Sequence, residues 1–209
     1  MRIERLNRLI EQKLVMIIRV KDPEEILPIV DYLVEAGVSA VEVTSNTPKY
    51  EQYIPKIKAQ NPSLLVGAGT ITNTELAKQA IDAGAEFLVT PNTSESVVKF
   101  AHDNQVPVVM GVLTPTDIVA AKEANADIIK LFPAEPLGPE YLKALAKGPF
   151  LDLPFFPVGG LDEKNTPLYL QAGAAGVGIG GSLTSPVNSD EERAEVIERI
   201  KVLLSHLSR

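Results

Sequence analysis

The stretch "EAGVSAVEV" at residues 35–43 joins the end of a predicted helix to a buried strand, and closely similar phrases occur three more times. They are "DAGAEFLVT" at 82–90, "EANADIIKL" at 123–131 and "QAGAAGVGI" at 171–179. In each phrase alanine is followed by glycine or asparagine, residues that tolerate the left-handed conformation just past a helix end. An apolar run then follows, so the order helix, stop, strand is repeated along the chain.

Eight apolar runs in all are candidate strands, and helical patterns separate them. They lie at 14–20, 40–45, 64–70, 87–92, 106–112, 127–133, 155–160 and 175–181. Strands that alternate with helices favour parallel pairing through right-handed crossovers. The sequence therefore predicts an α/β fold, a (β/α)8 TIM barrel, in one domain spanning residues 1–209. The alternative is a doubly wound open sheet, which usually has a glycine-rich turn after its first strand, and "IIRVKDPEE" at 17–25 has none.

The segment before the first strand predicts an extra N-terminal helix. Ile3, Leu6, Leu9 and Ile10 recur at helical spacing on one face. We expect this helix to cover the bottom of the barrel.

Composition limits the kinds of partner. A formal net charge of -7 without a basic patch disfavours a nucleic-acid partner, although a few amides and one cation can hold an anionic small molecule in a cleft. The chain has no cysteine and no apolar run of membrane-spanning length, so we expect a cytoplasmic protein without a membrane partner. His102 and His206 lack ligand-like spacing, and no metal site is expected.

Three charged residues fall near the carboxyl ends of predicted strands, which is where a barrel carries its chemistry. They are Arg19 on the first strand, Glu42 on the second and Lys130 on the sixth, within "IIKLFPAE" at 128–135. A single strand charge is more often an outward-facing salt-bridge member than a catalyst. Parallel barrel strands are buried on both faces, however, so inward-pointing charges would converge. Thr70 and Asn92 follow the third and fourth strands.

Lys130 among apolar neighbours has a chemical use. Burial disfavours its charged form, and the neutral amine can attack a ketone carbon to form a Schiff base. Glu42 could move protons to and from the resulting imine. The alternative is a structural Lys130–Glu42 ion pair.

Glycine pairs end the last two strands, in "PVGG" at 157–160 and "GIGGS" at 178–182. Barrels commonly bind phosphate there, through loop amides and a helix N-terminus. Glycine also serves close packing, but two pairs at the two expected places favour phosphate.

These motifs occur in an order that resembles a known family. "VEVT" with Glu42, "GAGT" with Thr70, "VTPN" with Pro91 and "IKLFPAE" with Lys130 precede "VGG" and "GIGGS". The chain is similar over nearly its whole length to the 2-keto-3-deoxy-6-phosphogluconate and 4-hydroxy-2-oxoglutarate aldolases. The lysine motif with its Phe-Pro-Ala-Glu tail is the most specific part.

The resemblance implies a class I aldolase without a cofactor, which cleaves a small-molecule substrate to pyruvate and an aldehyde such as glyceraldehyde 3-phosphate. By position, Lys130 would be the nucleophile and Glu42 the acid and base. The family also implies a homotrimer. The remaining implied contacts with substrate are Arg19 and Thr70 at the pyruvyl carboxylate or nearby hydroxyls, Pro91, Phe132 and Val158 along the pocket, and Gly159, Gly160, Gly181 and Ser182 at the phosphate.

Two positions depart from the phosphogluconate branch of this family. Asn46 stands where that branch has an arginine, and Val158 stands where it has a threonine. Both look like the relatives that cleave 2-keto-3-deoxy-6-phosphogalactonate, which differs in configuration at one hydroxyl-bearing carbon. Loss of one hydrogen-bond partner can shift selectivity by a large factor, so the preferred substrate stays open.

Three functions fit the residues. The first is the Schiff-base aldolase, which needs both Lys130 and Glu42. The second is a phosphate-binding isomerase or epimerase that uses Glu42 for enolisation and needs no covalent chemistry at Lys130. The third is a non-catalytic sugar-phosphate binding protein, which needs only the glycine pairs.

Overall fold

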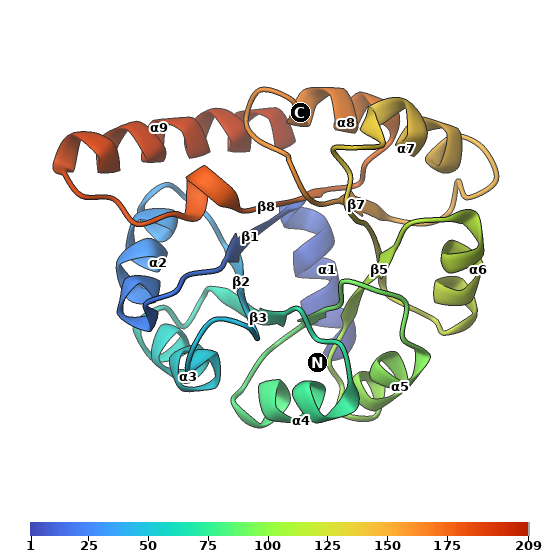
Figure 1. Ribbon diagram of the computed structural model, residues 1–209, viewed down its shortest axis with the longest axis horizontal. Helices are drawn as coiled ribbons and strands as arrows, with labels where there is room; N and C mark the ends of the chain where they lie inside the picture. Colours follow the sequence, from blue (N-terminus) through green and yellow to red (C-terminus); the bar gives the residue numbers. More distant parts are fainter. Residues whose placement is uncertain (209) are drawn as a thin grey trace.

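Eight parallel strands form a nearly closed barrel in the computed structural model, which describes residues 1–208 (Figure 1). Hydrogen-bonded neighbours follow the order β7-β6-β5-β4-β3-β2-β1-β8, and a parallel bridge between Val158 and Gly178 joins the two ends of the sheet. The predicted barrel is confirmed, and the open doubly wound sheet is wrong. The strands are β1 Leu14–Ile18, β2 Ala40–Thr44, β3 Leu65–Gly69, β4 Leu88–Val89, β5 Val108–Val112, β6 Ile128–Leu131, β7 Phe155–Pro157 and β8 Val177–Ile179.

Helices surround this barrel, as Figure 1 shows. The repeated stops lie where predicted, since Gly37, Gly84, Asn125 and Gly173 follow helices with positive φ angles of 98°, 95°, 60° and 110°. The helical elements are α1 Arg2–Gln12, η1 Pro23–Glu25, α2 Ile26–Glu35, α3 Tyr50–Gln60, α4 Thr74–Asp82, α5 Glu95–Asp103, α6 Pro115–Glu123, α7 Gly138–Ala146, α8 Thr166–Ala172, η2 Gly181–Thr184 and α9 Asp190–Leu207. Within residues 1–208 no helix has the length and apolar character needed to cross a bilayer.

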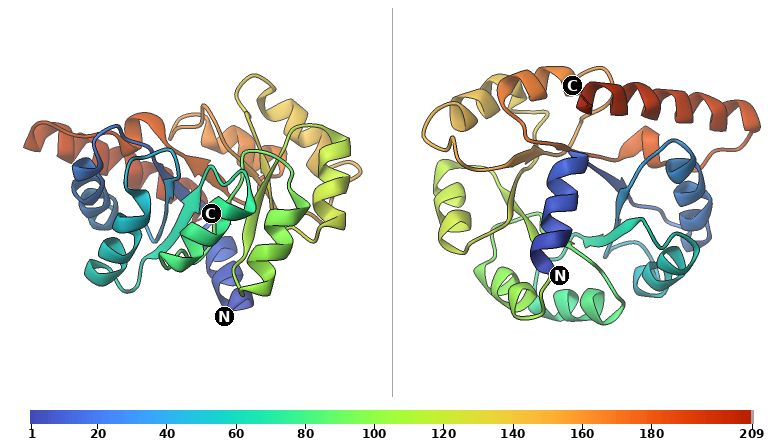
Figure 2. Two further views of the ribbon diagram at one scale, coloured as in Figure 1. Left: turned by 60° about the horizontal axis from the view of Figure 1, so that its bottom comes forward. Right: turned by 180° about the vertical axis from the view of Figure 1, so that it is seen from behind.

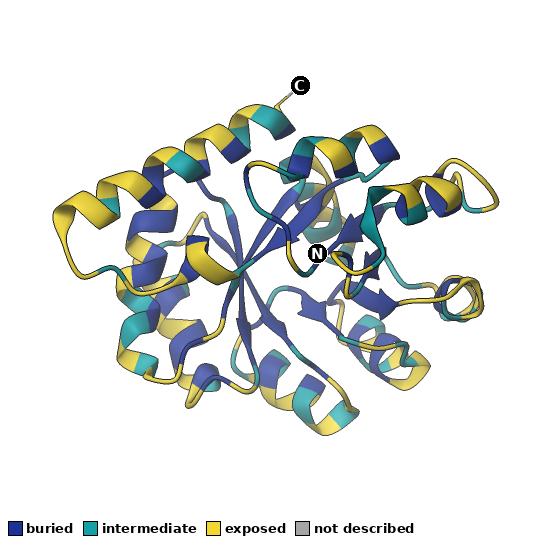
Figure 3. Cartoon of the chain, turned by 45° about the horizontal axis from the view of Figure 1, so that its top comes forward, coloured by how far each residue is buried: buried dark blue, intermediate teal, exposed yellow. Residues whose placement is uncertain are grey.

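Strand side chains alternate between two packed layers, and the strands are buried almost throughout (Figure 3). Leu14 and Met16 belong to the layer between sheet and helices. Val15, between them, belongs to the barrel interior, together with Leu9, Ala40, Leu65, Phe87, Val89, Val109, Ile128 and Phe156. Because successive strand residues point to opposite faces, the side chains two positions after Ala40 and Ile128 also point inward. Those residues are Glu42 and Lys130.

Small residues make room for large ones inside the barrel. A Cβ atom at Gly67 would overlap the ring of Phe87, and one at Gly176 would overlap the ring of Phe156. Both rings are fully or almost fully buried. The glycines therefore set where the two aromatic rings of the interior can lie.

Helix α1 crosses one end of the barrel, as the right-hand view of Figure 2 shows. Leu9 is fully buried and Leu6 packs against the interior cluster. Ile3 and Ile10 are 57% and 37% exposed. The prediction of a covering helix is confirmed, but the prediction that all four residues cover the barrel is wrong for Ile3 and Ile10. A helix lying across an opening buries only one stripe, and these two residues lie on its flank.

A buried carboxylate fixes the first turn of α1. Arg2 Nη1 donates to Asp127 Oδ1 at 2.6 Å, and the other carboxylate oxygen accepts the backbone N–H of Val108 at 2.8 Å. His102 Nε2 lies 2.8 Å from that same oxygen. Asp127 directly precedes β6, so these contacts tie α1 to the end of the barrel where the strands begin.

Truncating the buried stripe of α1 should destabilise the protein far more than truncating its flank. We expect Leu9→Ala to lower the free energy of unfolding by about 2–5 kcal/mol, because a fully buried leucine leaves a cavity. Ile3→Ala, on the same helix, should change it by less than about 0.5 kcal/mol. Urea denaturation followed by circular dichroism measures both values, and equal losses would contradict this placement of α1.

Candidate active site

A cleft of about 740 Å³ opens at the carboxyl ends of the strands. The fold brings all eleven residues proposed for catalysis and substrate binding together along its wall. They are Arg19, Glu42, Thr70, Pro91, Lys130, Phe132, Val158, Gly159, Gly160, Gly181 and Ser182.

Not every residue that lines the cleft could be predicted from the sequence. Ile17 shares the inward parity of Val15 and could have been found by counting along β1. Loop residues such as Asp162 and Ser185 also line the cleft, but no periodic signal marks them. Asn92 does not line it: β4 ends at Val89, and the exposed Asn92 side chain donates to the carbonyl of the next residue. The sequence placement of Asn92 at the site is therefore wrong.

Lys130 is enclosed by apolar groups at the base of the cleft. Its side chain comes from β6 between Gly111 of β5 and Phe156 of β7 in register, and only 5% of the residue is exposed. Its Nζ lies 4.7 Å from the centroid of the Phe132 ring. Burial lowers the pKa of Lys130, the charge of Glu42 acts in the opposite direction, and that of Arg19 adds to the lowering.

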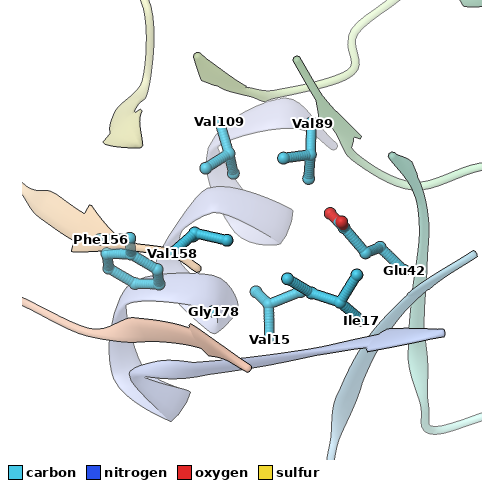
Figure 4. A pocket seen from close by; sticks show the side chains of 8 residues that line it. All are labelled: Val15, Ile17, Glu42, Val89, Val109, Phe156, Val158 and Gly178. Atoms are coloured by element: carbon cyan, nitrogen blue, oxygen red, sulfur yellow. The ribbon is translucent and has the colours of Figure 1, made fainter. Parts of the chain in front are cut away.

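Glu42 has even less contact with solvent, at 2% exposed. Figure 4 shows its carboxylate beside a small space of about 10 Å³, and the other residues around this space are Val15, Ile17, Val89, Val109, Phe156, Val158 and Gly178. These walls offer no polar side chain, and among the described residues 1–208 Glu42 Oε2 finds no hydrogen-bond partner. Burial raises the pKa of Glu42, and the charges of Lys130 and Arg19 offset part of that rise.

The geometry does not support the structural ion pair that was the alternative for these residues. Among residues 1–208 no salt bridge within 4.0 Å joins Lys130 to Glu42. Each group nevertheless shifts the pKa of the other through space. A Cβ atom at Gly69 would overlap the Glu42 carboxylate, so the glycine of "GAGT" provides the space that this carboxylate occupies.

Arg19 and Thr70 form a polar edge at the mouth of the cleft. Arg19 is exposed, and its Nη2 donates to Thr70 Oγ1 at 3.4 Å. Thr70 has a φ of 59°, a left-handed conformation that is costly for a β-branched residue and is concentrated at functional sites. Ser45 Oγ donates to its carbonyl at 2.8 Å and helps to hold it there.

The glycine pairs form the other side of the cleft. Gly159, Gly160 and Gly181 have φ angles of 100°, 76° and 67°, which favour glycine over other residues. Within residues 1–208 their N–H groups donate no backbone hydrogen bond. Free N–H groups at a strand end are suited to binding an anion.

Ionisation of Glu42 should cost stability. Glu42→Gln should raise the free energy of unfolding near neutral pH, because the folded state raises the pKa of this carboxyl. Below about pH 4 the carboxyl is neutral in the folded and unfolded chains alike, and the gain should disappear. Thermal or urea unfolding between about pH 4 and pH 8 measures it.

Glu163→Gln is the matched control, and it should change the free energy of unfolding in the opposite direction. A hydrogen bond from Arg199 holds the pKa of the Glu163 carboxyl below its usual value, so this substitution should lower stability at neutral pH. Its effect should fade as wild type is protonated in acid. A loss of stability at neutral pH in both variants would contradict the proposed burial penalty on Glu42.

Comparisons with known proteins identify the family of the chain. The family model described as KDPG and KHG aldolase matches residues 6–200. A 2-dehydro-3-deoxy-6-phosphogalactonate aldolase of Escherichia coli (strain K12) is 36% identical over 87% of this chain and 89% of that protein. A 2-dehydro-3-deoxy-phosphogluconate aldolase of Pseudomonas aeruginosa is 36% identical over 81% of this chain and 76% of that protein.

Solved structures of aldolases are also similar to this chain. One described as a native KDPGal structure has a TM-score of 0.85 and 33% identity, and covers 93% of this chain and 94% of its own. A 4-hydroxy-2-oxoglutarate/2-dehydro-3-deoxyphosphogluconate aldolase has a TM-score of 0.84 and 33% identity, and covers 97% of this chain and 98% of its own. With the match of the family model to nearly the whole chain, these similarities establish that the protein belongs to the KDPG and KHG aldolase family.

Proposed function

We propose that this aldolase, a carbon–carbon lyase, works by class I chemistry with Lys130 as the Schiff-base nucleophile and Glu42 as the acid and base. One observation carries the proposal: an amine and a carboxyl are both buried at the base of one cleft, 5% and 2% exposed, without forming an ion pair. Burial makes the amine less basic and the carboxyl less acidic. Burial therefore favours the free amine of Lys130 and the neutral carboxyl of Glu42 more than water does, which suits a nucleophile and a proton donor.

The first step joins the enzyme to the ketone. The neutral Nζ of Lys130 attacks the C2 carbonyl carbon of a 2-keto acid, and the carbonyl oxygen takes a proton to give a carbinolamine. Protonation of that hydroxyl releases water and leaves an iminium ion. The iminium withdraws electrons from C3, which is what carbon–carbon cleavage requires.

Cleavage then divides the substrate. The Glu42 carboxylate, through a water molecule, removes the proton of the C4 hydroxyl, and the C3–C4 bond breaks as that oxygen becomes an aldehyde carbonyl. The bonding pair moves to C3 and forms an enamine with the former iminium nitrogen. Glu42 returns the proton to C3, and water hydrolyses the new iminium to pyruvate and free Lys130.

The other residues of the cleft wall would bind different parts of the substrate according to their polarity. Arg19 and Thr70 would bind the pyruvyl carboxylate or nearby hydroxyls, because they form the polar edge beside Glu42. Phe132 and Pro91 would line the pocket around the reacting carbons. A phosphate would bind at the glycine loops, where the proposed contacts are Gly159, Gly160, Gly181 and Ser182.

The proposed substrate is a phosphorylated 2-keto-3-deoxy sugar acid, with a preference for the galactonate configuration. Asn46 and Val158 both lie on the cleft wall, and neither matches the phosphogluconate branch. A valine methyl cannot donate a hydrogen bond to a substrate hydroxyl, whereas a threonine hydroxyl can. The Escherichia coli relative named for phosphogalactonate cleavage is consistent with this preference.

A homotrimer and a cytoplasmic location complete the proposal. The trimer rests on the family to which the chain belongs, and the location rests on a sequence without cysteine and without an apolar run of membrane-spanning length. Sedimentation equilibrium measures the first, and a dimer or monomer mass would overturn it.

Replacing Lys130 separates this mechanism from enolisation. Lys130→Ala and Lys130→Arg should lower kcat/KM for cleavage by about 10⁴-fold or more, since neither side chain can form the Schiff base at neutral pH. Lys164→Ala, which removes an exposed lysine that does not line the cleft, should leave kcat/KM within about twofold. A coupled assay for pyruvate measures these rates. If Lys130→Ala still released pyruvate within tenfold of the wild-type rate, the Schiff base at Lys130 would be contradicted. A wild type that releases no pyruvate but converts the sugar acid in a Glu42-dependent way would favour the enolising isomerase.

Val158→Thr tests the preferred configuration. The substitution adds one hydroxyl to the cleft wall at nearly constant volume, so we expect kcat/KM to shift toward the gluconate epimer by about tenfold relative to the galactonate epimer. Parallel assays with the two phosphorylated acids measure this ratio. An unchanged ratio would show that Val158 does not select between them.

A further inference from the structure

One arginine outside the cleft contacts both loops proposed to bind phosphate. Arg199 on α9 donates from Nε to Glu163 Oε1 at 2.8 Å and from Nη2 to Glu163 Oε2 at 3.2 Å. The same Nη2 lies 3.2 Å from Ser182 Oγ. Glu163 belongs to the loop after β7 and Ser182 to η2 after β8. Glu195 lies one turn earlier on α9, at a spacing suited to an ion pair with Arg199, but Nε and Nη2 of Arg199 instead donate to the buried Glu163 carboxylate.

We propose that Arg199 is a positioning residue that holds Ser182 and the loop after β7 in the geometry that binds a phosphate. This rests on the function proposed above. A guanidinium has only hydrogen-bond donors, so Ser182 Oγ must accept in its bond to Arg199. Its own O–H hydrogen is then free to donate to an anion. The direction of one hydroxyl in the cleft is thus set by a residue on the outer helix.

Hydrogen bonds within the loop after β7 link the segment that contains Glu163 to the glycine pair at 159–160. Asn165 Nδ2 donates to the carbonyl of Gly160 at 2.8 Å, and Asn165 Oδ1 accepts the N–H of Asp162 at 3.0 Å. Asp162 Oδ1 in turn accepts the N–H of Asn165 at 2.9 Å. The segment from Gly160 to Asn165 is therefore cross-linked, and its buried Glu163, 7% exposed, is the point at which α9 holds it.

Loss of Arg199 should affect phosphorylated substrates alone. With Arg199→Ala we expect KM for the phosphorylated sugar acid to rise about tenfold, because a charge-assisted hydrogen bond to the loops is lost. The KM for 4-hydroxy-2-oxoglutarate, which carries no phosphate, should stay within about twofold of the wild-type value. Equal changes for the two substrates, or no change for either, would overturn the proposal.

Arg193→Ala is the matched control on the same helix. Arg193 Nη1 pairs with Glu35 Oε2 of α2 at 2.5 Å, and neither residue lines the cleft. This variant removes an ion pair of α9 while both KM values should stay unchanged. A rise of KM for the phosphorylated acid in Arg193→Ala as large as in Arg199→Ala would assign the effect to general loosening of α9 and overturn the proposal.

Two further variants locate the effect at Ser182. If Arg199 acts through this hydroxyl, Arg199→Ala should raise KM by less in a Ser182→Ala background than in wild type. Fully additive effects would contradict that route. Arg199→Lys keeps the charge but not the planar fork, so it should keep the fold and still raise KM for the phosphorylated acid. If Arg199→Ala unfolds, this variant carries the test, and wild-type KM in Arg199→Lys would count against the proposal.

Titration with inorganic phosphate separates this inference from the proposed function. Isothermal titration calorimetry of wild type, Arg199→Ala and Arg193→Ala needs no turnover. Weaker phosphate binding by Arg199→Ala alone would support the positioning role even if wild type cleaved no sugar acid. Equal phosphate affinity in the three proteins, with active wild type, would overturn the positioning role and leave the aldolase chemistry intact.

Discussion

The apolar interior of the barrel encloses an amine and a carboxyl, and this burial governs the chemistry of the site. Water would solvate both charged forms, and the interior does not, so burial shifts the pKa of Lys130 down and that of Glu42 up. A fold selected only for stability would place apolar side chains at these positions. The strands of the barrel keep the two groups there because their register and parity leave these side chains no outward orientation.

The interior is shaped around these groups by the sizes of their neighbours. Gly67 and Gly176 admit two aromatic rings that fill the lower barrel, and Gly69 admits the Glu42 carboxylate. Helix α1 and the Asp127 contacts cover the opposite end. Packed apolar side chains and the Asp127 contacts close the end where the strands begin, while Thr70 and the glycines with positive φ lie at the mouth. This separation lets the loops carry chemistry without forming the core.

The sequence predicts most of this arrangement because its signals are local and periodic. Helix stops at Gly37 and Gly173 and apolar runs between them are enough to give the strand order, and charges near strand ends identify Lys130 and Glu42. Predictions fail where the outcome depends on tertiary geometry. Asn92 follows a strand that is shorter than its apolar run. Ile3 lies on the solvent-exposed flank of α1. Arg199 binds the buried carboxylate of Glu163 rather than a carboxylate on its own helix. The spacing of residues along the sequence does not predict that Arg199 binds Glu163.

In the proposed mechanism Lys130 forms a Schiff base with a ketone. Incubation with saturating pyruvate, reduction with sodium borohydride and peptide mass spectrometry test it most directly, with Lys130→Ala treated in parallel. We expect one stable pyruvyl adduct on the peptide that contains Lys130 and none in the variant. Absence of an adduct at saturating pyruvate, or an adduct on a different lysine, would contradict it.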